Sequence, residues 1–430
     1  MENLRKRTLL GSAFLIFLSA AARSQDDRQH GDERWMSARP DGRAPIGVTK
    51  DCPHQFGEWR LPYADMFMLT LADELQPVET EGRDKEYPPV YLGLCCSKCG
   101  GNMPLNIPGG GVPETHEWRL KLSGTYMNMP RLRDGTNSVS TSEALQDFMA
   151  VPTEMNMTMT SLSVAYSFTD DFIAGLMPMY MTKDMEMERR NGQQFSMKSQ
   201  GPGDTMLMTK YRLYTDDPLI PTRQFSALLG LNLPTGSINE EDNGVSLPYS
   251  MQLGSGTFDP IIGLLYQESS TPWWWGANLL HTNRLYDNGR GYHLGDEFRY
   301  DLYGMYQLTY SLVTELQVNG KYSGKISGQR DDIEGGLGHM MNDPAMPFMT
   351  PLFDADNYGG HTIRLTAGLQ WQPFPLHIVN LQVSYPVYQD LNGPQMEEGF
   401  QVMLSWYVEI PTGASRRGGR KVGGLDVLGF

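Results

Sequence analysis

From His116 onward, hydrophobic and polar side chains alternate along strand-like segments of about ten or more residues. The segment 296–311 shows the pattern clearly. Phe298 and Leu302 fall on one face, whereas Arg299 and Asp301 fall on the other. One face suits lipid and the other suits water, which is the repeat of a strand in a transmembrane β-barrel.

Twelve segments of this kind follow one another. They span residues 116–129, 154–168, 171–182, 203–214, 224–234, 254–267, 273–284, 296–311, 312–323, 361–372, 376–388 and 399–410. The links between them alternate between short and long, as the periplasmic turns and external loops of outer-membrane barrels do. We therefore predict an all-β fold, a transmembrane up-and-down antiparallel β-barrel of about 12 strands over residues 116–410.

The even strand number places both termini on the periplasmic side. Trp273, Trp274 and Trp275 follow a short turn, and we expect them in the periplasmic aromatic girdle. A soluble two-sheet sandwich is the alternative fold because its strands would also alternate, but its apolar face would lack such consistent flanking by tyrosine and tryptophan.

The first 22 residues have the order of a secretory signal peptide. Arg5, Lys6 and Arg7 precede an apolar run over residues 9–18, and small residues follow up to Ala22. The run is too short to span a bilayer as a helix. We therefore expect export, and the barrel pattern assigns the protein to the outer membrane of a diderm bacterium.

Residues 23–115 are rich in proline, glycine and charge, and we expect an irregular periplasmic region. The piece 107–111, rich in glycine, is interpreted as a linker. The four cysteines of the chain lie in this region, at Cys52, Cys95, Cys96 and Cys99. They are either disulfide partners in an oxidising compartment or ligands of a soft metal. Residues 411–430 form a basic, glycine-rich C-terminal tail.

Composition narrows the function. The chain of 430 residues is 40% hydrophobic and 20% charged, with 46 glycines and 21 tyrosines, which suits a turn-rich β protein. Its formal net charge of −15 excludes nucleic acid as an expected partner, because phosphate binding needs clustered Lys and Arg. The expected partners are the lipid bilayer and a small-molecule or metal-ion solute.

The 27 methionines are numerous, and most strand methionines share parity with polar residues. A merely hydrophobic methionine on a barrel strand should face lipid. The methionines predicted to face the lumen are Met127, Met129, Met155, Met157, Met159, Met206 and Met208. Met177, Met179 and Met181 share one side of their strand; a three-residue turn around Asp170 would bring them to the lumen, and a two-residue turn would place them against lipid.

Thioether sulfur is a soft, uncharged ligand that selects Cu(I) or a similar cation. An external loop adds a second soft cluster, His339 with Met340 and Met341. The candidate metal ligands are therefore Met155, Met157, Met159, Met177, Met179, Met181, Met206, Met208, His339, Met340 and Met341. Copper(I) is the one candidate cofactor. The alternative is that methionine fills a narrow lumen with flexible side chains.

Several motifs resemble a family of outer-membrane transporters named for the meta-pathway of phenol degradation. They lie at 201–204, 210–214, 230–236, 253–259 and 388–395, and the motifs at 133–136, 151–155 and 357–361 resemble its methionine-rich branch. The resemblance covers about residues 116 to 410 and implies an outer-membrane barrel that moves small solutes, aromatic or hydrophobic ones by the family name. The tail after residue 410 departs from the family's usual ending.

The sequence thus predicts a non-enzymatic outer-membrane channel or transporter, with soft metal ions such as copper or silver as the first substrate class. Aromatic or hydrophobic compounds are the alternative. A lipid hydrolase of the outer membrane is a third alternative, because such an enzyme can assemble Ser and His from different strands. The scattered histidines that bear on it are His116, His281, His361 and His377.

Overall fold

The structure is a computed structural model that describes residues 103–109, 114–217, 221–270, 272–309, 311–373 and 376–415. The predicted signal peptide, the four cysteines and the basic residues of the tail lie outside the described residues. In these ranges no helix is both long and apolar enough to cross a membrane.

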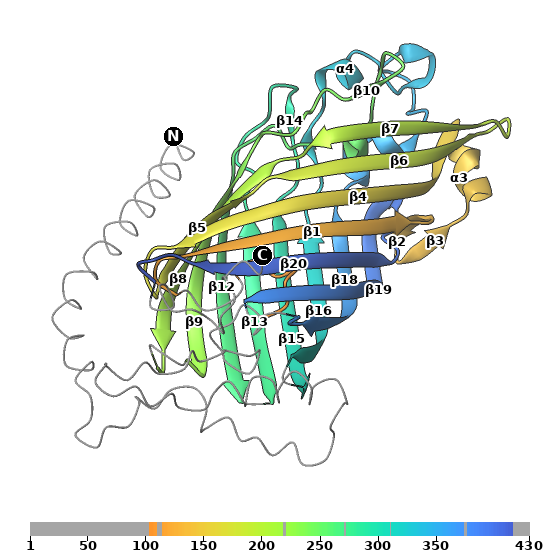
Figure 1. Ribbon diagram of the computed structural model, residues 1–430. Coiled ribbons are helices and arrows are strands. Elements are labelled where there is room, and N and C mark those ends of the chain that lie inside the picture. The colour runs from red at the N-terminus through yellow and green to blue at the C-terminus, as the bar shows by residue number, and fades with distance from the viewer. Residues whose placement is uncertain are drawn as a thin grey trace, which may run out of the picture. The chain divides into compact units, whose positions relative to one another are not determined.

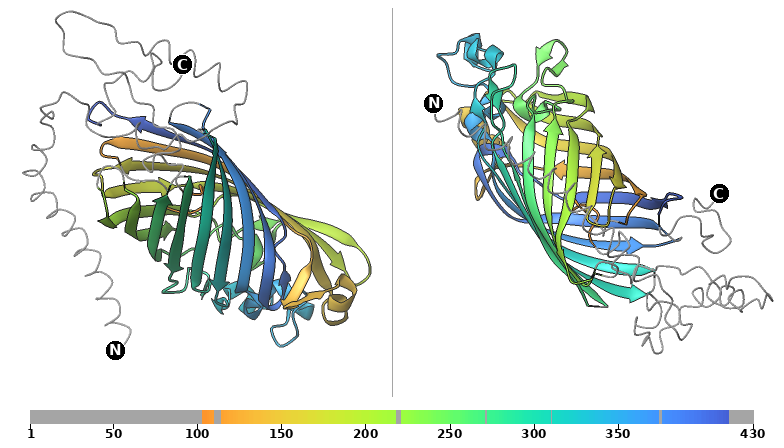
Figure 2. Two further views of the ribbon diagram at one scale, coloured as in Figure 1. Left: turned by 90° about the horizontal axis from the view of Figure 1, so that it is seen from below. Right: turned by 90° about the vertical axis from the view of Figure 1, so that its left-hand side faces the viewer.

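The fold is a closed antiparallel β-barrel of 12 strands, as predicted, and not a two-sheet sandwich (Figures 1 and 2). Ten of these strands are continuous: β1 (Glu117–Met129), β4 (Ala150–Ser167), β9 (Arg223–Leu233), β12 (Asp259–Ser270), β13 (Trp273–Thr282), β15 (Glu297–Thr309), β16 (Leu312–Ser323), β18 (Gly360–Trp371), β19 (His377–Met396) and β20 (Gln401–Pro411). The ring closes where the first strand pairs with the last, with Trp118 opposite Ile410 and Met127 opposite Gln401.

The two remaining barrel strands are each broken in two. One consists of β5 (Phe172–Met177) and β6 (Met179–Arg189), and the other of β7 (Gln194–Pro202) and β8 (Thr205–Thr215). The first break falls at Pro178, which has no N–H to donate to a neighbouring strand.

The break also changes the strand partners. The β5 segment pairs with β8, whereas β6 pairs with β7 in a long hairpin that extends past the end of β1 (Figure 1). Residues 183–202, expected as an external loop, therefore continue the strands; the alternation of Met185 and Met187 with Glu186 and Glu188 carries the period-two pattern onward.

Short turns gather at one end of the barrel and long loops at the other. Glu117 lies opposite both Pro411 and Ser167, and a short turn over residues 168–171 follows Ser167. The described chain therefore enters and leaves the barrel at the short-turn end. The long-loop end carries short elements: β2 (Leu132–Gly135), β3 (Asn137–Val139), α3 (Thr141–Asp147), β10 (Glu241–Asp242), β11 (Val245–Ser246), η3 (Tyr249–Met251), β14 (Tyr292–His293), β17 (Ser327–Gly328), α4 (Asp331–Glu334), η4 (Met340–Asn342), η5 (Pro351–Phe353) and η6 (Ala355–Asn357).

The outer surface of the barrel is apolar, as a transmembrane barrel requires. Leu162, Leu176 and Leu316 are exposed on it, the last to 67%. Trp273 and Trp275 are also exposed, next to a short turn. Trp274 corrects one expectation: alternation turns it inward, where only 2% of it is exposed.

Candidate functional site: the barrel lumen

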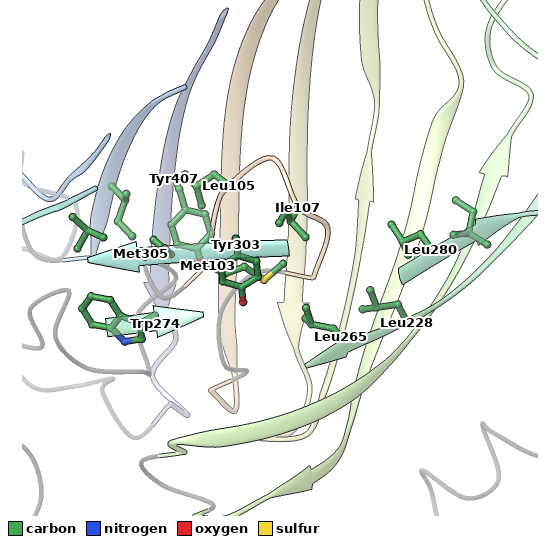
Figure 3. Packing of buried hydrophobic residues seen from close by; sticks show 13 residues of the cluster. Met103, Leu105, Ile107, Leu228, Leu265, Trp274, Leu280, Tyr303, Met305 and Tyr407 are labelled. Atoms are coloured by element: carbon green, nitrogen blue, oxygen red, sulfur yellow. The ribbon is translucent and has the colours of Figure 1, made fainter. Parts of the chain in front are cut away.

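A short N-terminal segment, residues 103–109, lies inside the short-turn half of the barrel. Met103, Leu105 and Ile107 are almost completely buried and join one hydrophobic cluster with inward residues of the strands. Figure 3 shows these three side chains between Trp274, Met305, Tyr303 and Tyr407 on one side and Leu228, Leu265 and Leu280 on the other. Residues 103–109 were expected to belong to an irregular periplasmic region. Because they lie inside the barrel, we call them the lumen segment.

Hydrogen bonds fix the lumen segment on several strands. Lys121 Nζ donates to the Leu105 carbonyl oxygen at 2.7 Å. The other bonds join Gln370 Nε2 to the Met103 carbonyl oxygen (3.0 Å), Lys210 Nζ to the Gly109 carbonyl oxygen (2.8 Å), Asn106 Nδ2 to Gln317 Oε1 (2.9 Å) and Gln382 Nε2 to Asn106 Oδ1 (2.9 Å). Buried backbone carbonyls need such partners, so the polar lining is matched to the segment.

A glycine allows the chain to turn inside the lumen. Gly109 has a φ of +87°, and a Cβ there would lie 2.9 Å from a methyl group of Leu228. Any other residue would be strained in this backbone conformation and would also press on the barrel wall. Gly109, which belongs to the piece interpreted as a linker, therefore has a specific place in the barrel.

The long-loop half of the lumen contains a cavity of about 500 Å³. Methionines supply part of its wall: Met129, Met155, Met157, Met179, Met181 and Met396. Charged side chains supply another part: Lys183, Asp204, Arg284, Lys321 and Glu398. Tyr249, Leu352 and Tyr358 line it from the loops. The lumen is thus filled in one half and hollow in the other.

One loop folds into the barrel over this cavity. Lys183 Nζ donates to the carbonyl oxygens of Ser250 (2.8 Å) and Gln252 (2.6 Å). Ser199 Oγ donates to the Met251 carbonyl oxygen at 2.7 Å. These bonds hold the η3 turn against the strand wall and bury Met251 completely. We call residues 247–253 the inward loop.

The base of the same loop is held by a carboxylate. Asp204 accepts hydrogen bonds from the backbone nitrogens of Gly236 (3.0 Å) and Ser255 (2.8 Å) and from Ser255 Oγ (2.7 Å). The Asp204 carboxylate sits at the break between β7 and β8, so the strand break itself provides the anchor.

Three charged residues of the cavity wall form ion pairs: Lys321, Glu398 and Arg284. Glu398 binds Lys321 Nζ at 2.7 Å and also pairs with Arg364, while Arg284 pairs with Asp259. Burial alone would raise the pKa of the Glu398 carboxyl, but Lys321 and Arg364 outweigh it and hold that pKa at about 2. In the loops above, burial raises the pKa of Tyr249 to about 12, so its hydroxyl stays protonated.

The strand methionines all lie on the inward face. Leu162, Leu176 and Leu207, of opposite parity, are exposed on the outer surface. Ser167 lies opposite Ile173, so an odd number of residues, 168–172, separates the two partners. This has the same effect as the expected three-residue turn and keeps parity across the hairpin. The predicted lumenal set therefore holds: Met127, Met129, Met155, Met157, Met159, Met177, Met179, Met181, Met206 and Met208.

The inward methionines fall into two groups. Met206 and Met208 pack against the cluster that holds the lumen segment. Met155 belongs to a second cluster nearer the long-loop end, with Met185, Met187 and Met251. Met185 and Met187 were missed because residues 183–202 were expected to be a loop. Met251 carries no periodic signal at all, since only the folded inward loop places it there.

The second predicted metal cluster, His339 with Met340 and Met341 in an external loop, is less compact than the inward methionines of the strands. The His339 ring packs against the Phe348 ring in a tilted arrangement, and its Nδ1 contacts the Met346 carbonyl oxygen at 2.6 Å. Met341 is 87% exposed. The segment His339–Met341 is therefore not gathered with the lumenal methionines. Within the described part of the chain, no group of three or more His, Cys, Asp or Glu could hold a metal ion.

The histidines considered for catalysis have other partners. His116 Nδ1 lies 3.0 Å from the hydroxyl of Tyr166, and His361 Nε2 lies 3.0 Å from that of Tyr300. His377 stacks on Trp406. These are contacts on the aromatic outer surface.

Fold and lumen together define a transmembrane β-barrel with a partly filled interior. Residues 128–340 match the family described as "Putative MetA-pathway of phenol degradation". This part of the chain is thus similar to the family that its motifs indicated. No curated protein matches the chain.

Several solved barrels are similar to this chain in structure. An outer membrane channel from Pseudomonas putida F1 is 14% identical, with 71% of this chain and 99% of that chain covered and a TM-score of 0.47. A Pseudomonas aeruginosa FadL homologue is 10% identical over 73% of this chain and 97% of that chain, with a TM-score of 0.36. The P. putida toluene transporter TodX is 9% identical over 70% and 91%, with a TM-score of 0.34.

Proposed function

We propose that this protein is a non-enzymatic outer-membrane channel for small aromatic or other hydrophobic solutes, with both termini in the periplasm. The observation that carries the proposal is the cavity of about 500 Å³ with methionines in its wall. The match of residues 128–340 to a family named for phenol degradation supports it. A cavity of this size falls within the range of small-molecule sites.

The chemistry of the wall suits such solutes. Thioether sulfur makes favourable contacts with aromatic rings, and flexible methionines adapt to different shapes. The charged residues of the wall have partners within the protein. Lys321 pairs with Glu398, whereas Lys183 is held by hydrogen bonds to backbone carbonyls. The methionine part of the wall can therefore receive a neutral solute, while the polar groups still offer a hydrogen bond to a hydroxyl.

The first expectation from the sequence, transport of copper or silver, finds no support in the comparisons. The alternative expectation fits the family better, so aromatic or hydrophobic solutes take its place. The inward thioethers are nonetheless a feature of the lumen.

A flux experiment tests the proposal. The full-length protein in liposomes should admit phenol or toluene faster than empty liposomes do, and faster than it admits a sulfonated aromatic of similar size. Met181→Glu, which places a carboxylate on the cavity wall, should reduce the flux of phenol. Tyr180→Phe on the outer surface is the matched control and should leave it unchanged.

Two results would refute the proposal. One is equal phenol flux with and without a correctly folded barrel. The other is release of fatty acid from a phospholipid or ester by the purified protein, which would favour the lipid hydrolase instead.

A further inference from the structure

Four methionines lie in register across four neighbouring strands of the barrel. Met129 of β1 lies opposite Met155 of β4, Met155 lies opposite Met185 of β6, and Met185 lies opposite Met197 of β7. All four share the inward face. We call Met129, Met155, Met185 and Met197 the methionine row.

The row brings sulfur atoms within reach of one another. Directly opposed residues of an antiparallel pair have Cβ atoms about 4.5–5.5 Å apart. Methionine has three rotatable side-chain bonds, so neighbouring thioethers can converge on one point. A continuous row of this kind differs from isolated methionines scattered among leucines.

A further thioether comes from the inward loop. Met251 is completely buried in the same cluster as Met155 and Met185, and Met187 and Met396 also belong to it. The hydrogen bonds of Lys183 and Ser199 to the carbonyls of residues 250–252 hold this loop in place. The Lys183 ammonium group is thereby turned toward these carbonyls.

The cluster is also accessible from the lumen. Met129 and Met155 line the cavity, whereas Met185 and Met251 lie buried behind them. A small ion in the cavity would therefore meet two exposed thioethers first and the buried ones next. Clustered neutral sulfur ligands such as these methionines select a soft monovalent cation over Mg²⁺, Ca²⁺ or Zn²⁺.

We propose that the methionine row and Met251 form a binding site for Cu(I) or Ag(I) inside the long-loop half of the barrel. The site is independent of the aromatic channel function: it requires binding of the ion, and no passage of it through the barrel. Its ligands also differ from the predicted set, since Met129, Met185, Met197 and Met251 join Met155 while Met206 and Met208 do not.

The test compares two sets of substitutions in the full-length protein in detergent. In the first, Met155→Leu, Met185→Leu and Met197→Leu are combined, which keeps volume and apolarity but removes three sulfur atoms. In the second, Met206→Leu and Met208→Leu are combined, also in the lumen but against the lumen segment. Affinity is measured with Cu(I) in competition with a chromogenic Cu(I) chelator and with Ag(I) by titration calorimetry.

Loss of a residue that only supports a metal ligand typically weakens metal binding by roughly 10–100-fold. The triple variant loses three ligands, so its affinity for Cu(I) and Ag(I) should fall by more than this. The double variant should bind both ions like the native protein. X-ray absorption of the Cu(I)-loaded native protein should show sulfur neighbours only. Equal affinity of the native protein and the folded triple variant would overturn the proposal, as would equal losses in both variants.

A second measurement avoids substitution altogether, in case the triple variant fails to fold. Native protein labelled with ¹³C at the methionine methyl groups is titrated with Ag(I) and followed by NMR. A subset of methyl signals should shift at stoichiometric Ag(I). No shift, or a uniform shift of all signals, would overturn the proposal. Phenol flux is measured in parallel, so the channel function can fail or succeed on its own.

Discussion

The two halves of the lumen differ in how the space inside the barrel is occupied. In the short-turn half, inward side chains such as Trp274 and Leu228 are matched by a segment of the chain itself. In the long-loop half, the inward loop closes over the wall but leaves a cavity of about 500 Å³. The barrel wall alone therefore does not determine whether the lumen is open. The segments folded into it, the lumen segment and the inward loop, determine how much space remains.

The strongest way to break this contrast is to expel the lumen segment. Leu105→Asp would bury a carboxylate in an apolar cluster, at a cost of several kcal/mol per ion. The segment should leave the lumen, and single-channel conductance in planar bilayers should rise well above that of the native protein. Leu105→Met, which conserves volume, is the control. Unchanged conductance of Leu105→Asp would mean that the segment does not limit the path.

The next largest effect is expected where the filled half is most tightly packed. Trp274→Ala removes a side chain that is 2% exposed and should cost about 3–5 kcal/mol, as large aromatic truncations in cores do. Met157→Ala, on the cavity wall, should cost less because its neighbours already border empty space. Thermal unfolding in detergent measures both, and similar losses would contradict the contrast.

The inward loop should respond to loss of its lysine. Lys183→Met leaves the carbonyls of Ser250 and Gln252 without their donor, which should cost about 1–3 kcal/mol. Hydrogen exchange should increase in residues 247–253 while the lumen segment remains protected. An equal increase in both would show that the two halves are coupled.

A smaller effect should depend on pH. The carboxyl of Glu398 has a pKa of about 2 in the folded protein, below its ordinary value of 4.5. Because this pKa is lowered, the ionised group stabilises the fold fully above about pH 4.5, and the stabilisation is lost as the pH falls toward 2. Unfolding temperature should therefore drop over this window in the native protein and less in Glu398→Gln. Parallel pH curves would contradict the assignment.

The smallest effect is expected for Met157→Leu, which changes the cavity wall without changing its volume. The cost should stay below about 1.5 kcal/mol, and phenol flux should fall only slightly. A large loss of stability would show that the cavity wall is packed as tightly as the filled half.

The barrel could be predicted from the sequence because its strands alternate so regularly. The outward turn of Leu162 and the inward turn of Met155, Met157 and Met159 follow from parity alone. Residues 183–202 were expected to be a loop, although Met185 and Met187 continue the alternation of the preceding strand.

The filling of the lumen could not be predicted in this way. The lumen segment is too short and too rich in glycine and proline for any period, and its contacts with Gln370 and Gln317 come from strands far along the chain. Met251 is likewise placed by the hydrogen bonds of Lys183 and Ser199 and by no local pattern. Only tertiary structure brings these residues to the site.

The position of the lumen segment, just before β1, also has a kinetic consequence. Its hydrogen bonds to Gln317, Gln370 and Gln382 join residues 211 to 276 positions apart. Contacts of such long sequence separation form late, because the loop that they close is entropically costly. We therefore expect this segment, although it precedes every barrel strand in the described chain, to complete its contacts only after the strands that carry Gln317, Gln370 and Gln382 are in place.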